Sequence, residues 1–156
     1  FRYGEKNIKK LKDSLVSIVK IWTVTSISLI LIGLIVRKPL IQVFMSKEST
    51  IAFYNMALYG ITIEIFSIPF CSGNFTTSRL FVSVGNAKTA TIISIFRNLV
   101  FRSASLLILP YMFGVNGVWF AIPFGEFVAF IMVVIIIYIN KDNYGYGKSG
   151  VAYYIK

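Results

Sequence analysis

Residues 118–139 read VWFAIPFGEFVAFIMVVIIIYI, a run in which Glu126 is the only charged side chain. A helix needs about 20 apolar residues to cross the hydrocarbon core of a bilayer, and this run is long enough. Ala121, Gly125 and Ala129 recur along it at every fourth position. Small residues at that spacing form a ridge that lets another helix approach closely. The stretch therefore predicts a membrane-spanning helix that packs against a neighbour.

The preceding sequence contains three more apolar runs, at about residues 15–36, 51–84 and 89–110. Shorter polar, basic or glycine-containing segments separate the runs, so we expect four membrane-spanning helices. The second run is longer than a bilayer needs, and Pro69 predicts a bend within it. Residues 40–47 mix apolar and polar side chains, which fits either a short amphipathic helix in the headgroup plane or a loop tucked against the bundle.

The composition agrees with a lipid environment and excludes several other classes of protein. Of 156 residues, 56% are apolar and 14% are charged, whereas ordinary soluble domains contain about 25% charged residues. The net charge of +10 would suggest nucleic acid binding in a soluble protein, but here the basic residues mostly flank the apolar runs. The chain has no His, a single Cys (Cys71), no nucleophile motif and no cluster of metal ligands. We therefore expect neither an enzyme, nor a metal site, nor a nucleic acid partner.

The basic residues predict how the helices are oriented. If the four runs cross the membrane, ten basic residues lie on the side of both chain ends and three on the opposite side. The first group is Arg2, Lys6, Lys9, Lys10, Lys12, Arg79, Lys88, Lys141, Lys148 and Lys156, and the second is Arg37, Lys38 and Lys47. Basic residues are in excess on the cytoplasmic side of membrane proteins, so both ends of this chain are expected in the cytoplasm.

A stripe of small or polar residues runs along the second apolar run. Its members recur at alternating steps of four and three, which places them on one helical face. They are Gly60, Glu64, Ser67, Cys71, Asn74 and Ser78. Close helix packing explains the small residues but not a carboxylate, because a charge within the bilayer costs roughly 2.5 kcal/mol or more. Glu64 is therefore a candidate functional side chain.

Two arginines and a second carboxylate lie within the other runs. Arg97 either reaches headgroup phosphates near the cytoplasmic end or faces the bundle interior. Counted inward from the outer ends, Glu64, Arg102 and Glu126 each lie about 12–14 Å deep. We expect an arginine flanked by two carboxylates at one level, acting either as a static ion pair or as a group that binds and releases a cation or proton. The polar residues expected on the face of Arg102 are Ser94, Asn98 and Ser105.

Three segments resemble the multidrug and toxin extrusion (MATE) family of transporters, and most closely its MepA-like bacterial members. Residues 3–7, YGEKN, resemble the loop that opens the last helices of these proteins. Residues 84–88, VGNAK, resemble their GxxK turn. The most specific likeness is in residues 109–119, LPYMFGVNGVW, which resemble the turn between the final two helices, with Glu126 at the position of an acid that usually follows.

The resemblance implies a fold and a function. MATE proteins are all-α, with twelve membrane-spanning helices in two lobes. Residues 1–140 would be the last four helices of the second lobe, 141–156 a cytoplasmic polar tail, and the chain a C-terminal piece whose partner is the N-terminal lobe of the same protein. The family exchanges Na⁺ or H⁺, without another cofactor, for organic cations across the plasma membrane by alternating access. The residues expected to serve ion coupling or the substrate pathway are Glu64, with Na⁺ near it, Glu126, Arg102, Asn74 and Arg97.

Other functions stay open at this point. A lipid-linked oligosaccharide flippase of the same superfamily would favour a cationic cavity, and Arg97 and Arg102 are its best support. A small four-helix membrane protein would have to form an oligomer to shield Arg102. Export of aromatic organic cations is favoured by Glu64 with Phe and Tyr nearby, because both charge and cation–π contacts attract such compounds.

Overall fold

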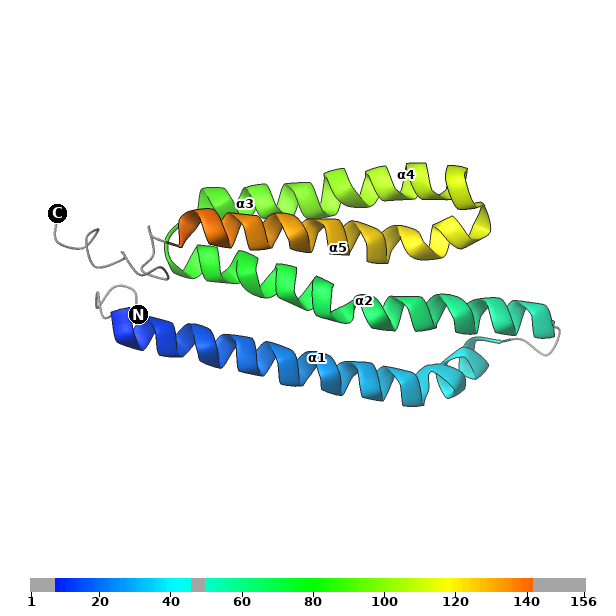
Figure 1. Cartoon of the computed structure of the whole chain (residues 1–156). Coiled ribbons are helices and arrows are strands. Elements are labelled where there is room, and N and C mark those ends of the chain that lie inside the picture. The colour runs from blue at the N-terminus through cyan, green and yellow to red at the C-terminus, as the bar shows by residue number, and fades with distance from the viewer. Residues whose placement is uncertain (1–7, 46–49, 142–156) are drawn as a thin grey trace.

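The structure, a computed structural model, describes residues 8–45 and 50–141. Its elements are α1 (Ile8–Phe44), α2 (Ile51–Ser83), α3 (Ala87–Ile95), the π-helical segment η1 (Phe96–Phe101), α4 (Arg102–Phe113) and α5 (Val115–Asn140). α3, η1 and α4 follow one another without a break and form one rod (Figure 1). The resulting four rods are each long and apolar enough to span a membrane, and the described residues contain no strand. The all-α membrane bundle predicted from the sequence is therefore confirmed.

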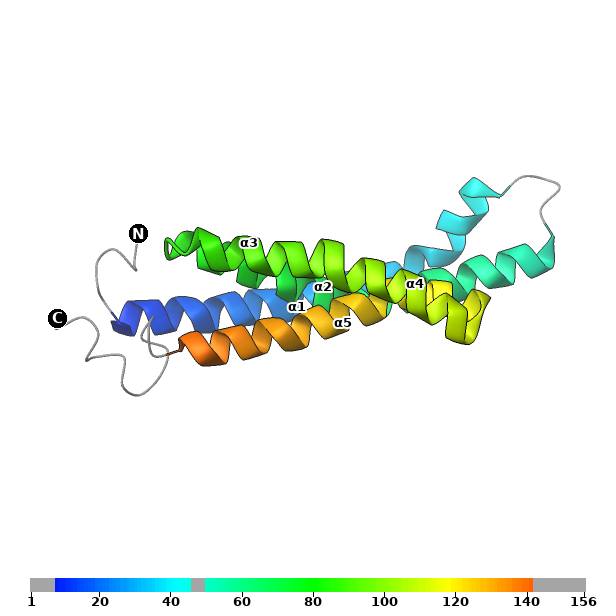
Figure 2. The same ribbon diagram turned by 90° about the horizontal axis from the view of Figure 1, so that it is seen from above.

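Successive rods run antiparallel to one another and pack side by side. α2 contacts α1, α3 and α5, and α5 also contacts α4. Figures 1 and 2 show the α2–α3 turn at the end of the bundle where α1 begins and α5 ends, with the α4–α5 turn at the opposite end. A buried apolar cluster lies where α2, α3 and α5 meet, and it consists of Phe81, Val84, Ala90, Ile93 and Val133. The predicted tail beyond Lys141 lies outside the described residues. So do residues 1–7 and 46–49, which include the basic residues Arg2, Lys6 and Lys47.

Hydrogen bonds between hydroxyl, indole and carbonyl groups connect α1 to α2. The Nε1 of Trp22 donates to the Ser72 hydroxyl at 2.9 Å and to the Pro69 carbonyl at 3.2 Å. The hydroxyl of Ser26 lies 3.0 Å from that of Ser72. Polar groups such as these hold membrane helices together, because lipid gives little apolar driving force for association. The predicted bend at Pro69 coincides with this contact, and α2 changes direction near its middle (Figure 1).

The first helix ends later than the sequence suggested. We expected it to stop near residue 36 and residues 40–47 to form a separate amphipathic helix or a loop, but α1 continues through Pro39 to Phe44. A proline within a helix removes one hydrogen bond and pushes against the preceding turn, so it can kink a helix without ending it. The last part of α1 turns away from the rest of the helix (Figure 2). Ile41 is buried there, at 4% exposure, which anchors the extension.

The turn between α4 and α5 is also tighter than expected. The apolar runs predicted from the sequence end near residue 110 and resume at 118, whereas α4 ends at Phe113 and α5 begins at Val115. Gly114 makes this possible because its φ of 59° lies in the left-handed region, which favours glycine. A Cβ on Gly117 would collide with the backbone carbonyl of Leu109. The two glycines therefore let α5 fold back directly along α4.

Candidate functional site

The ridge of small residues on α5 brings Glu126 against the neighbouring helices. Ala121, Gly125 and Ala129 are all buried. A Cβ on Gly125 would lie only 3.2 Å from the carbonyl oxygen of Phe101 and 3.3 Å from the Cα of Arg102. Because α5 approaches the α3–α4 rod so closely, the next residue, Glu126, is 1% exposed and faces polar groups rather than lipid.

Glu126 is the centre of an ion-pair network. The Nε of Arg97 lies 3.1 Å from both carboxylate oxygens, and the Nη2 of Arg102 donates to Oε1 at 2.8 Å. Arg97 is 13% exposed and Arg102 36% exposed. The carboxylate therefore holds two guanidinium groups, and each charge offsets part of the desolvation of the others.

Asn74 joins α2 to the same carboxylate. Its Nδ2 donates to Glu126 Oε2 at 2.9 Å and to the Glu126 backbone carbonyl at 3.0 Å. The side chain is fully buried, and its Oδ1 has no hydrogen-bond partner in the described part of the chain. Charge-assisted hydrogen bonds of this kind are stronger than neutral ones. We call Glu126, Arg97, Arg102 and Asn74 the Glu126 network, and it links three of the four rods.

The π-helical segment explains how both arginines reach one carboxylate. In a regular α-helix, residues five positions apart point about 140° away from each other. A π turn closes with hydrogen bonds between residues five apart, so such residues return to nearly the same side. Arg97 and Arg102 have this spacing, and η1 covers Phe96–Phe101 between them. The sequence analysis missed this turn, and the available signal was the five-residue spacing of two arginines near a single acid.

The predicted arrangement of charges is met only in part. Arg102 pairs with Glu126 as expected and its charge also acts on Glu64, but the second ion-pair partner of the Glu126 carboxylate is Arg97. Among the described residues, no basic side chain forms an ion pair with Glu64. The reason is geometric: α2 extends beyond the α4–α5 turn (Figure 1), so counting inward from the helix ends placed Glu64 too deep. Glu64 also precedes Asn74 by ten positions, which is about 15 Å along a helix.

Glu64 has a less polar environment of its own. It is half-buried on α2, and the Ser67 hydroxyl donates to its backbone carbonyl at 2.7 Å and lies 3.5 Å from Oε2. One turn away, Gly60 lies against the ring of Trp119 on α5. The carboxylate is therefore partly exposed in the described part of the chain, with a hydroxyl beside it.

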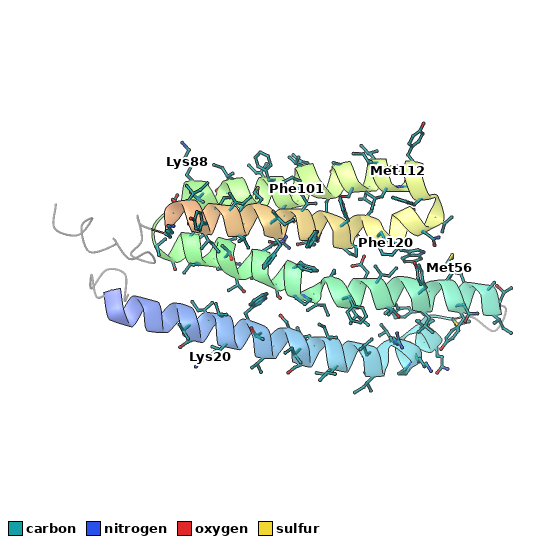
Figure 3. The ribbon with its side chains drawn as sticks, in the orientation of Figure 1. Lys20, Met56, Lys88, Phe101, Met112 and Phe120 are labelled. Carbon is teal, nitrogen blue, oxygen red and sulfur yellow. The ribbon has the colours of Figure 1, made fainter. Side chains whose placement is uncertain are left out.

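The polar stripe on α2 faces the bundle, as its spacing predicts. Cys71 Sγ lies 3.6 Å from Arg97 Nη2, and the Ser78 hydroxyl lies 3.3 Å from that of Ser94. The stripe predicted on the third rod is broken, however. Ser105 is buried but Asn98 is exposed, because η1 rotates the two halves of the rod relative to a continuous α-helix. Lys20 takes no part in the Glu126 network and projects from the outer side of α1 (Figure 3). Phe101, the last residue of η1, is labelled in the same figure.

Comparisons with known proteins agree with this architecture. The family model MatE matches residues 1–106. One solved structure, described only as "protein A", is 26% identical in sequence and superposes with a TM-score of 0.80. The match covers 94% of this chain and 32% of that one, so the chain spans about a third of the length of the solved protein. No curated protein sequence matches the chain. Within the described residues, no group of three or more Cys, Asp or Glu side chains could hold a metal ion.

Proposed function

Because the chain belongs to the MatE family of membrane transporters, we propose that it is part of a cation-coupled efflux antiporter. In this proposal the protein exports organic cations across the plasma membrane by alternating access, and Na⁺ or H⁺ moves in the opposite direction. Both ends of the chain lie in the cytoplasm, as the excess of basic residues at that end favours. The remaining helices of the transporter come from the rest of the same protein.

The observation that carries the proposal is the unpaired carboxylate of Glu64. Glu126 accepts hydrogen bonds from three side chains, which leaves little capacity to exchange ligands. Glu64 has no ion pair with the described residues and lies on the face of α2 that meets the other helices. A charge in a membrane helix is costly, so an unpaired acid points to a ligand that neutralises it. In this proposal Na⁺ or a proton, and then an organic cation, bind alternately and neutralise the Glu64 carboxylate.

The test is transport by the whole protein that contains this chain. In proteoliposomes, efflux of a fluorescent organic cation is measured with a Na⁺ gradient at constant pH and, separately, with a pH gradient without Na⁺. We expect one gradient to drive efflux and Glu64→Gln to lower it at least tenfold. Lys20→Gln is the matched control, since Lys20 is exposed on the outer side of α1. Undiminished efflux by Glu64→Gln would remove Glu64 from the mechanism.

A lipid-linked oligosaccharide flippase is the second candidate. The observation in its favour is the charge of the Glu126 network, in which two arginines face one carboxylate and leave a positive excess. Such an excess suits a phosphate-bearing substrate better than a cation. Loss of a cell-surface glycan on deletion of the gene, together with no gradient-driven export of organic cations, would favour the flippase over the exporter.

A further inference from the structure

A second polar site lies apart from Glu64, between α2 and the α3–η1 rod. It is a groove with a volume of ≈ 680 Å³ that extends from the α2–α3 turn, beside Val82 and Ala87, to Leu99 in η1. Its polar lining residues are Ser78, Arg79, Thr91, Ser94, Arg97 and Asn98, and the lining contains no acidic side chain. The groove therefore combines the guanidinium of Arg79, and that of Arg97, which is also paired with Glu126, with hydroxyl and amide groups.

Arg79 supplies an oriented positive charge at this groove. Its guanidinium lies 4.9 Å from the ring centroid of Phe75, one turn earlier on α2. A cation–π contact of this kind holds the group in place without neutralising its charge. No acidic side chain among the described residues forms an ion pair with Arg79. Within the described part of the chain, the residue is also exposed.

Arg97 contributes donors from the inner end of the groove. A guanidinium has five N–H donors, and Arg97 uses Nε for Glu126 and directs Nη2 at Cys71. Donors remain for a ligand in the groove. The hydroxyls of Ser78 on α2 and Ser94 on α3, 3.3 Å apart, and the exposed amide of Asn98 also line the groove.

These groups match a phosphate. Arginine side chains and hydroxyls bind phosphate oxygens, and basic pockets between membrane helices bind anionic lipid headgroups. Apolar neighbours in the lining, Val82, Ile95 and Leu99, suit an acyl chain better than a soluble anion. We propose that the groove between α2 and the α3–η1 rod binds the phosphate headgroup of an anionic phospholipid. The site goes beyond the proposed function, because it requires neither transport of the lipid nor a role for Glu64.

The experiment measures lipid binding by the whole protein in detergent, by native mass spectrometry. Phosphatidylglycerol and phosphatidylcholine of equal chain length are titrated separately, and inorganic phosphate is added as a competitor. We expect phosphatidylglycerol to bind about tenfold more tightly than phosphatidylcholine and Arg79→Gln to weaken it about fivefold, since one basic residue near the headgroup contributes about 1 kcal/mol. Arg79→Lys should retain most of the binding, and Lys20→Gln should leave it unchanged.

A second groove variant keeps the test independent of folding. Asn98 is exposed, so Asn98→Ala should fold normally and weaken phosphatidylglycerol binding two- to threefold. Equal binding of the two lipids, or an equal effect of Arg79→Gln and Lys20→Gln, would overturn the site. Displacement of the lipid by millimolar inorganic phosphate would overturn the lipid as its natural ligand. Because binding is measured without a gradient, failure here leaves the efflux proposal untouched.

Discussion

Glu126 and Glu64 are carboxylates on neighbouring membrane helices, yet their surroundings are opposite. Glu126 is buried and bonded to Arg97, Arg102 and Asn74, so removal of its charge leaves two guanidinium groups without a partner. Glu64 is half-buried, and among the described residues Ser67 is the one side chain within hydrogen-bond distance of its carboxylate. The contrast separates an acid whose partners hold helices together from one whose partners leave it open to the ligand that we propose for it.

The largest difference in stability is expected between the variants that neutralise the two carboxylates. Glu126→Gln should destabilise the whole protein by about 3 kcal/mol, because it leaves the largely buried Arg97 and the half-exposed Arg102 without their carboxylate. Glu64→Gln should not destabilise the protein, since it breaks no ion pair and removes an uncompensated charge from a membrane helix. Thermal unfolding of both variants in detergent measures the difference. Equal stability of the two variants would show that the Glu126 network does not hold the rods together.

A smaller difference is expected between two glycines, one near each carboxylate. Gly117 lies in the α4–α5 hairpin that carries Arg102 and Glu126, and a Cβ there meets the Leu109 backbone. A Cβ on Gly33 meets only the side chain of Ile65, next to Glu64, at 3.0 Å. Gly117→Ala should therefore cost about 1–3 kcal/mol, the usual range for overpacking, and Gly33→Ala clearly less. The same unfolding measurement applies, and the reverse order would contradict the tight hairpin.

The smallest difference is expected within the Glu126 network itself. Arg97 contacts both carboxylate oxygens and is 13% exposed, whereas Arg102 contacts one and is 36% exposed. Arg102→Gln should cost about 1 kcal/mol, close to the value for a solvent-accessible pair, and Arg97→Gln about twice that. Thermal unfolding of the single variants, and of each arginine variant combined with Glu126→Gln, measures the coupling free energy of each arginine to Glu126. A larger loss of stability in Arg102→Gln than in Arg97→Gln would show that the Arg102 pair contributes more to the Glu126 network.

The sequence was sufficient for the helices but not for the pairing of charges. Long apolar runs predict membrane spans because lipid imposes a minimum length, and a period near 3.6 predicts which face of α2 is polar. Which acid meets which arginine depends on the relative displacement of α2 and on η1, and neither follows from hydropathy. Pro39 and Gly114 likewise have local effects that depend on packing: one bends α1 instead of ending it, and the other shortens a predicted loop.

The π turn in the third rod also determines how this chain tolerates insertions and deletions. A π turn holds one residue more than the α-helix it interrupts. Removal of one residue from 98–101 would let the rod wind as a continuous α-helix with its two halves still facing the same way. Removal of one residue from α4 before Ser105, with the π turn kept, would instead rotate everything after it by about 100°. The polar face of α3 toward Ser78 and the buried face of α4 at Ser105 would keep their register in the first variant and lose it in the second. This helix should therefore tolerate a one-residue deletion at η1 and not beyond it.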